Sequence, residues 1–138
     1  MAKQVFEILR EVSKKANKAD KVAVLKANDN WALKDVIRGS MDSTVKWLLP
    51  EGAPPYTPSE EHNHPTSLLR ENRKFAYFAR GGKGGDIPAF KRERMFIEML
   101  EGVHPEDALL LIDMISKKKP KGLSRPVVEE AFPGLLRD

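Results

Sequence analysis

Apolar residues recur at three- and four-residue intervals along most of this chain, and glycine, proline or asparagine repeatedly interrupts the pattern. The spacing is clear at Val5, Leu9 and Val12, and again within residues 90–100 and 109–115. Such intervals place apolar side chains on one face of a helix. We therefore predict an all-α fold, in which residues 1–138 form a single domain of six or seven short helices.

The interrupting residues also predict where helices begin and end. Asn17, with Asp20 three residues later, forms an approximate capping box. Gly39 is placed to end a third helix as a C′ glycine. Asp86, with Pro88 in the first turn, is expected to begin a helix whose apolar stripe includes Phe90. Further caps are expected at Thr66, His104 and Ser124.

Two segments do not follow the helical pattern. Residues 44–49 have a strand-like composition, although a buried helical turn fits them equally well. Residues 50–65 contain five prolines, Gly52 and three glutamates, and carry no lysine or arginine. A continuous helix is excluded there. Such a long irregular segment is either a functional loop or one fastened across the surface.

Composition excludes several classes of protein. No apolar run approaches the roughly 18 residues that a membrane helix requires, and the first residues lack the apolar core of a signal peptide, so we expect a cytoplasmic protein. The absence of cysteine excludes disulfides and thiolate metal sites. A net charge of +4 suits a polyanionic partner, or simply solubility.

Residues 81–85, Gly-Gly-Lys-Gly-Gly, are the strongest candidate site. Glycines allow close approach of a phosphate to backbone N–H groups, and Arg80 and Lys83 add positive charge. The alternative is a flexible connection with an incidental lysine. A second cluster follows the helix at 105–115, where it either contacts DNA or complements the helix dipole. The predicted DNA contacts are Arg80, Gly81, Gly82, Lys83, Gly84, Gly85, Lys91, Lys117, Lys118, Lys119 and Lys121.

Other notable residues favour structural roles. His62 and His64 lie two residues apart, but a metal site needs three or four converging ligands, so we predict a surface loop and no metal or other cofactor. Trp31 and Trp47 are expected in the core. No set of side chains suggests a nucleophile or an acid–base pair, so we expect no enzyme.

An ordered set of motifs resembles one known module. The set comprises residues 9–36, the helix–loop–helix of residues 75–100, the run at 105–114, and residues 127–136, which end in Phe-Pro-Gly-Leu-Leu. Together they resemble the N-terminal all-helical DNA-binding domain of tailed-phage ATP-dependent DNA ligases. The adenylated lysine of those enzymes lies in a Lys-x-Asp-Gly motif, whereas here Lys18-Ala-Asp20 is followed by Lys21. The chain stops two residues after the final motif, so we expect the catalytic domains to be absent.

The resemblance implies a non-catalytic protein that binds the phosphate backbone of double-stranded DNA with little base specificity. It would act as an accessory in phage DNA replication or repair, in the cytoplasm of an infected bacterium. The alternative is a protein-interaction module that uses the same fold to contact a sliding clamp or another replisome protein, or that serves as a phage structural or host-takeover protein. No membrane partner is expected.

Overall fold

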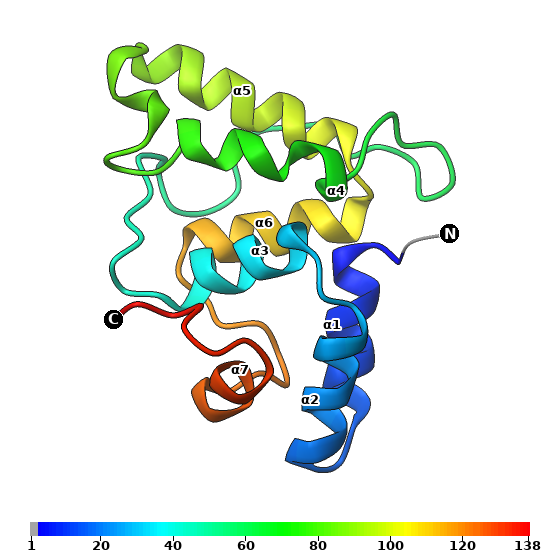
Figure 1. The fold of residues 1–138 in the computed structure, drawn as a ribbon. Helices are drawn as coiled ribbons and strands as arrows, with labels where there is room; N and C mark the ends of the chain where they lie inside the picture. Colours follow the sequence, from blue (N-terminus) through cyan, green and yellow to red (C-terminus); the bar gives the residue numbers. More distant parts are fainter. Residues whose placement is uncertain (1–2) are drawn as a thin grey trace.

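The computed structural model describes residues 3–138 and confirms the all-α fold (Figure 1). Within these residues there are seven α-helices, two 3₁₀ helices and no strand. The α-helices are α1 (Val5–Lys14), α2 (Lys18–Ala27), α3 (Trp31–Met41), α4 (Leu68–Glu71), α5 (Ala89–Gly102), α6 (Pro105–Ile115) and α7 (Arg125–Ala131). The 3₁₀ helices are η1 (Asn72–Tyr77) and η2 (Lys83–Asp86). None of the helices among the described residues is long and apolar enough to span a membrane.

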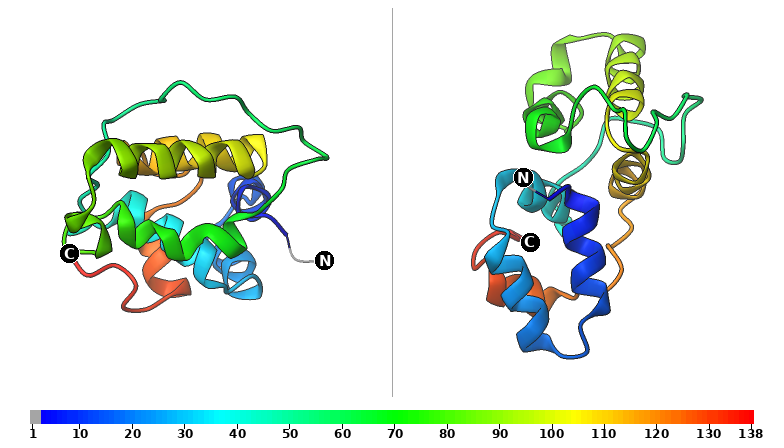
Figure 2. Two further views of the ribbon diagram at one scale, coloured as in Figure 1. Left: turned by 90° about the horizontal axis from the view of Figure 1, so that it is seen from above. Right: turned by 90° about the vertical axis from the view of Figure 1, so that its right-hand side faces the viewer.

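Helices α3 and α6 pack against each other at the centre of the domain. On one side, α5 packs against α6, while α4 and η1 pack against α3 (Figures 1 and 2). On the other side, α1 contacts α6, and α2 contacts both α1 and α7. The core contains fully buried side chains from both sides, such as Leu25, Leu33, Phe78 and Leu111. The two helix groups therefore share one continuous core.

Most predicted helix starts are confirmed, because their caps are short-range contacts. The side chain of Asn17 accepts a hydrogen bond from Asp20 N–H at 2.9 Å. The His104 side chain accepts one from Glu106 N–H at 3.0 Å, directly before the proline that begins α6. Ser124 caps α7 through Val127 N–H.

Three predicted boundaries are wrong. Gly39 lies inside α3, which continues to Met41. A Cβ at this glycine would lie 2.6 Å from the Trp47 ring and 2.8 Å from Met114 Sδ, so its role is close packing rather than helix termination. Asp86 ends η2, and α5 begins at Ala89. Ser67, not Thr66, precedes α4.

Three large apolar side chains that the sequence predicted to be buried are exposed. They are Trp31, Phe90 and Leu109, with 67%, 67% and 57% of their surface accessible. Each lies in the first half of its helix. By contrast, Trp47 is half-buried, as the core prediction for it required.

The proline-rich segment of residues 50–65 is fastened across the surface. Gly52 N–H donates to Ser116 Oγ, and Thr57 N–H donates to Glu101 Oε2 at 2.7 Å. Tyr56 packs against the core. The segment arcs past α5 and α6 in the left-hand view of Figure 2. The preceding residues 44–49 form a single bridge, between Trp47 and Ala79, rather than a strand.

Candidate functional site

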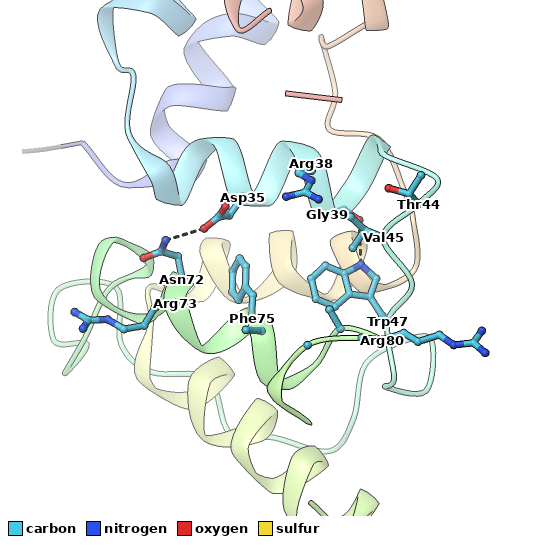
Figure 3. A pocket seen from close by; sticks show the side chains of 14 residues that line it. Asp35, Arg38, Gly39, Thr44, Val45, Trp47, Asn72, Arg73, Phe75 and Arg80 are labelled. Atoms are coloured by element: carbon cyan, nitrogen blue, oxygen red, sulfur yellow. Dashed lines mark hydrogen bonds between the residues drawn. The ribbon is translucent and has the colours of Figure 1, made fainter. Parts of the chain in front are cut away.

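A groove of about 400 Å³ lies between α3 and η1 and contains three arginines. Arg38 comes from α3, Arg73 from η1, and Arg80 from the residues that follow η1. In Figure 3, Arg73 and Arg80 lie at the two ends of the groove, and Arg38 lies between them. Gly81 and Gly82 also line it. We call this feature the arginine groove; it collects positive charge from residues more than forty positions apart.

A short backbone pairing fixes Arg80 at the end of the arginine groove. Arg80 N–H donates to the Lys46 carbonyl, and Leu48 N–H donates to the Phe78 carbonyl, each at 2.7 Å. Residues 46–48 and 78–80 are thereby held side by side. Lys46 is exposed and is a direct neighbour of Arg80 in this pairing. The end of the groove therefore carries two cations on two separate chain segments.

Aromatic side chains form the floor of the arginine groove. Trp47 donates from Nε1 to the Gly39 carbonyl at 3.0 Å. Its ring meets that of Phe75 edge to face, with ring centres 6.2 Å apart. These contacts join α3, the 44–48 segment and η1 into one rigid base.

Two carboxylates lie near the guanidinium of Arg38. Its Nε is 3.6 Å from Asp42 Oδ2. Asp42 is fully buried, and burial disfavours its charge, but hydrogen bonds from Thr44 and Arg137 N–H outweigh this and lower its pKa. Asp35 lines the groove, and burial raises its pKa despite the hydrogen bond from Asn72. Asp42 therefore positions Arg38, and the groove keeps a net positive lining.

Part of the glycine-rich loop forms a 3₁₀ helix. Residues 83–86 form η2, which packs against η1. A Cβ at Gly84 would lie 1.7 Å from the Tyr77 carbonyl oxygen, and one at Gly82 would lie 2.2 Å from that of Ala76. Gly82 N–H is already used in a hydrogen bond to Ala79. These two glycines allow close packing of backbones. Within residues 81–85 only Gly84 is buried, and the other four residues are exposed.

Lys117 has a structural role within the predicted basic cluster. It adopts a left-handed backbone conformation, with φ of 58°, at the end of α6. Its N–H donates to Met114 O, and Lys118 N–H donates to Asp113 O, which is the Schellman pattern. Its ammonium donates to the carbonyls of Gly39, Asp42 and Val45 at 2.7, 2.7 and 3.1 Å. Partial burial lowers its pKa.

The other lysines of that cluster line a different groove. This groove, of about 770 Å³, lies between α1, α6 and the connection that follows α6. Its basic residues are Arg10, Lys14, Lys118, Lys119 and Lys121, and its apolar residues are Phe6, Leu9, Leu109, Leu110 and Pro120. We call it the lysine groove. In the right-hand view of Figure 2, α3 and α4 lie on one side of the domain and the α6–α7 connection lies on the other.

The structure therefore divides the predicted site between two faces. Arg80, Gly81 and Gly82 lie in the arginine groove, and three lysines lie in the lysine groove. Lys91, in the first turn of α5, is exposed but lines neither groove.

Comparison with known protein families gives one match, a family of unknown function (DUF6433), over residues 8–121. The chain belongs to the DUF6433 family. Among curated proteins, no match was found. The stretch shared with DUF6433 includes both grooves almost entirely, since only Phe6 of their linings precedes it. Helix α7 and the Phe-Pro-Gly-Leu-Leu turn lie beyond the matched stretch.

Sequence reasoning missed Arg38 and Arg73 in this DUF6433 domain. Arg38 is an isolated basic residue in a helical segment, Arg73 is one of several bases in its segment, and neither stands in a motif. Only the packing of η1 against α3 brings them to one groove. The four basic residues from Arg70 to Arg80 were a signal in the sequence. Which of them line a groove depends on the packing of η1 against α3.

The histidines show no metal site. His64 and His104 pack edge to face with ring centres 5.5 Å apart, and His104 stacks on Phe6. Beneath them Asp107 is fully buried and accepts a hydrogen bond from Phe6 N–H at 2.9 Å. Among residues 3–138, no group of three or more such side chains is arranged to hold a metal ion. This cluster links the start of α1 to the start of α6.

Proposed function

We propose that this chain is a non-catalytic domain that binds the phosphate backbone of double-stranded DNA with little sequence preference. The observation that carries the proposal is the arginine groove, which Arg38, Arg73 and Arg80 line from separate elements, with Arg73 and Arg80 at its two ends (Figure 3). Guanidinium groups bind phosphate oxygens bidentately. Phosphate contacts position a protein on DNA without selecting a sequence. The groove is open to the surface.

The resemblance to the N-terminal DNA-binding domain of phage ATP-dependent DNA ligases agrees with this function. It includes residues 75–100, which contain Arg80 and border the groove. The proposed role is accordingly that of an accessory protein in phage DNA replication or repair inside an infected bacterium. Within this role the glycine-rich loop contributes the exposed charge of Lys83, and the arginines supply most of the phosphate contacts.

A salt-titrated binding assay tests this function. Fluorescence anisotropy with a labelled blunt duplex should show affinity that falls steeply as salt rises. Arg73→Ala and Arg80→Ala should each lower the slope of log affinity against log salt by about one contact, equally for unrelated sequences. Lys26→Ala, at an exposed position on α2, is the matched control. Absence of duplex binding at roughly 50 mM salt would reject the function.

The lysine groove favours a second candidate, a protein-interaction module. It combines five basic residues and two acidic ones, Glu106 and Asp113, with an apolar lining that includes the exposed Leu109. A partner surface with acidic residues around an apolar side chain would fit, and a sliding clamp or another replisome subunit is the candidate. Leu109→Ser should then weaken binding to the purified clamp without loss of folding. Tyr56→Ala is a poorer test, because Tyr56 packs against the core.

A further inference from the structure

Trp31 is the least expected surface residue of this protein. It is the first residue of α3, and 67% of its surface is accessible. The ammonium of Lys34 lies 4.2 Å from the centre of its ring. Lys34 is itself held by Asp29, at 2.7 Å, and lies 5.6 Å from the centre of the Phe132 ring. The indole is thus supported on one side by an ordered cation and is otherwise largely open to solvent.

Trp31 lies on the same face as the arginine groove. A further groove of about 360 Å³ runs between α3 and the C-terminal turn, and its lining includes Trp31, Lys34 and Arg137. Asp35 and Arg38 line this groove and also the arginine groove. The two grooves are therefore adjacent along α3, with Trp31 at one end and Arg80 at the other.

The surroundings of Trp31 favour a nucleic-acid base over a protein side chain as its ligand. Tryptophan at a protein interface is usually surrounded by other contacts that exclude water. Five of the ten other residues that line this groove are charged, and three of them are cations: Lys34, Arg38 and Arg137. The two acids are Asp29 and Asp35, and the uncharged residues all come from the C-terminal turn, residues 131–135. An exposed aromatic ring beside cations that follow a groove is typical of single-strand binding, in which bases stack on the ring and the cations contact the backbone.

We propose that Trp31 stacks on an unpaired base, so that the preferred ligand is duplex DNA that continues into a single strand. This inference rests on the proposed function, because the arginine groove supplies the duplex contacts. The single strand would leave the duplex near Arg38 and pass along α3 to the indole. Stacking is tolerant of base identity, so the preference concerns DNA structure and not sequence.

The test compares a blunt duplex with the same duplex carrying a single-stranded overhang, using the full chain. Wild type should bind the overhang duplex about tenfold more tightly, the range expected for one stacked base. Trp31→Ala should remove this preference and leave blunt-duplex affinity within about twofold. Trp31→Phe should retain part of the preference, because a smaller ring still stacks. Phe90→Ala, which removes another exposed aromatic side chain that lines none of these grooves, is the matched control.

Tryptophan fluorescence gives an independent measurement, because the chain has two tryptophans. The overhang should quench wild type more than Trp31→Phe, in which only the half-buried Trp47 remains. Circular dichroism establishes that each variant is folded. An overhang preference that Trp31→Ala leaves unchanged would overturn the inference while the DNA-binding function stands. Equal affinity of wild type for both probes would also overturn it. Loss of clamp binding in Trp31→Ala, with DNA affinities unaffected, would assign the residue to a protein partner.

Discussion

At the scale of single residues, Gly84 and Gly85 are neighbours with opposite structural requirements. A Cβ at Gly84 would overlap the Tyr77 carbonyl at 1.7 Å, whereas one at Gly85 meets nothing within 4 Å. Gly84→Ala should therefore separate η2 from η1 and lower the free energy of unfolding by about 1–3 kcal/mol. Gly85→Ala should change it by less than about 0.5 kcal/mol. Urea denaturation of the pair measures the difference, and equal stability of the two variants would contradict this account of the loop.

Lys117 combines a strained backbone with a bonded side chain, and two substitutions separate these contributions. Lys117→Ala loses the hydrogen bonds to three carbonyls and keeps a Cβ in the left-handed conformation. Lys117→Gly loses the same bonds but relieves the backbone, by about 1 kcal/mol. We expect thermal unfolding to rank the proteins wild type, then glycine, then alanine. An alanine variant as stable as the glycine variant would show that the conformation is not strained.

At the scale of elements, Asp107 connects the starts of α1 and α6, and this contact depends on pH. Burial raises the pKa of Asp107 to about 7, despite the hydrogen bond from Phe6 N–H and the influence of His64. The unfolded carboxyl titrates near 3.9. The native state therefore binds more protons than the unfolded state between these values, so this residue's contribution to stability is lost as pH rises through the range. His104 has the opposite effect on stability. Burial and His64 lower its pKa, so its contribution to stability increases as pH rises toward about 6.5.

Asp107→Asn should remove the part of the pH dependence of stability that comes from the carboxyl group and leave the part that comes from His104. The amide oxygen can still accept from Phe6 N–H, so the variant should match wild type near pH 5. At pH 8 it should be more stable, on the order of 2 kcal/mol, because no charge is buried. Denaturation curves across this pH range test the sign. A wild type that remains more stable than the variant at pH 8 would show that the native state stabilises the Asp107 carboxylate, so that its pKa is not raised.

Helix positions were predictable from sequence where a local contact determines them. Asn17 and Ser124 bond to backbone groups three residues away, so their caps can be recognised in the sequence. Gly39 and Gly84 were misinterpreted because their neighbours come from other elements: Met114 and Trp47 for the first, Tyr77 for the second. A glycine required for close packing looks, in sequence, like a glycine that ends a helix or loosens a loop.

The candidate site was predictable only in part, for the same reason. Arg80 stood out beside the glycine-rich loop, but Arg38 joins it only through the packing of α3 against η1. The lysines after α6 form one cluster in sequence. In the structure, Lys117 turns toward the end of α3, while Lys118 and Lys119 line the lysine groove. Sequence proximity therefore overstated how many of these residues act together.

At the scale of the whole molecule, the basic residues of the two grooves lie on different sides of the domain, and this determines the final prediction. A duplex of about one helical turn bound in the arginine groove cannot at the same time reach lysines on the far side of the domain. Arg73→Ala/Arg80→Ala should therefore weaken binding of such a duplex and reduce the salt slope by about two contacts. Lys118→Ala/Lys119→Ala should leave both quantities nearly unchanged, although it removes the same net charge.

The matched charge of the two double variants makes this comparison specific. If binding depended only on net charge, both variants would weaken it equally. If the lysine groove were the DNA site, the ranking would be reversed. Repeating the anisotropy titration with a long duplex adds a further distinction, because such a duplex can bind several copies of the protein. A loss seen for the lysine variant only with long DNA would assign the lysine groove to contacts between neighbouring protein molecules on one duplex.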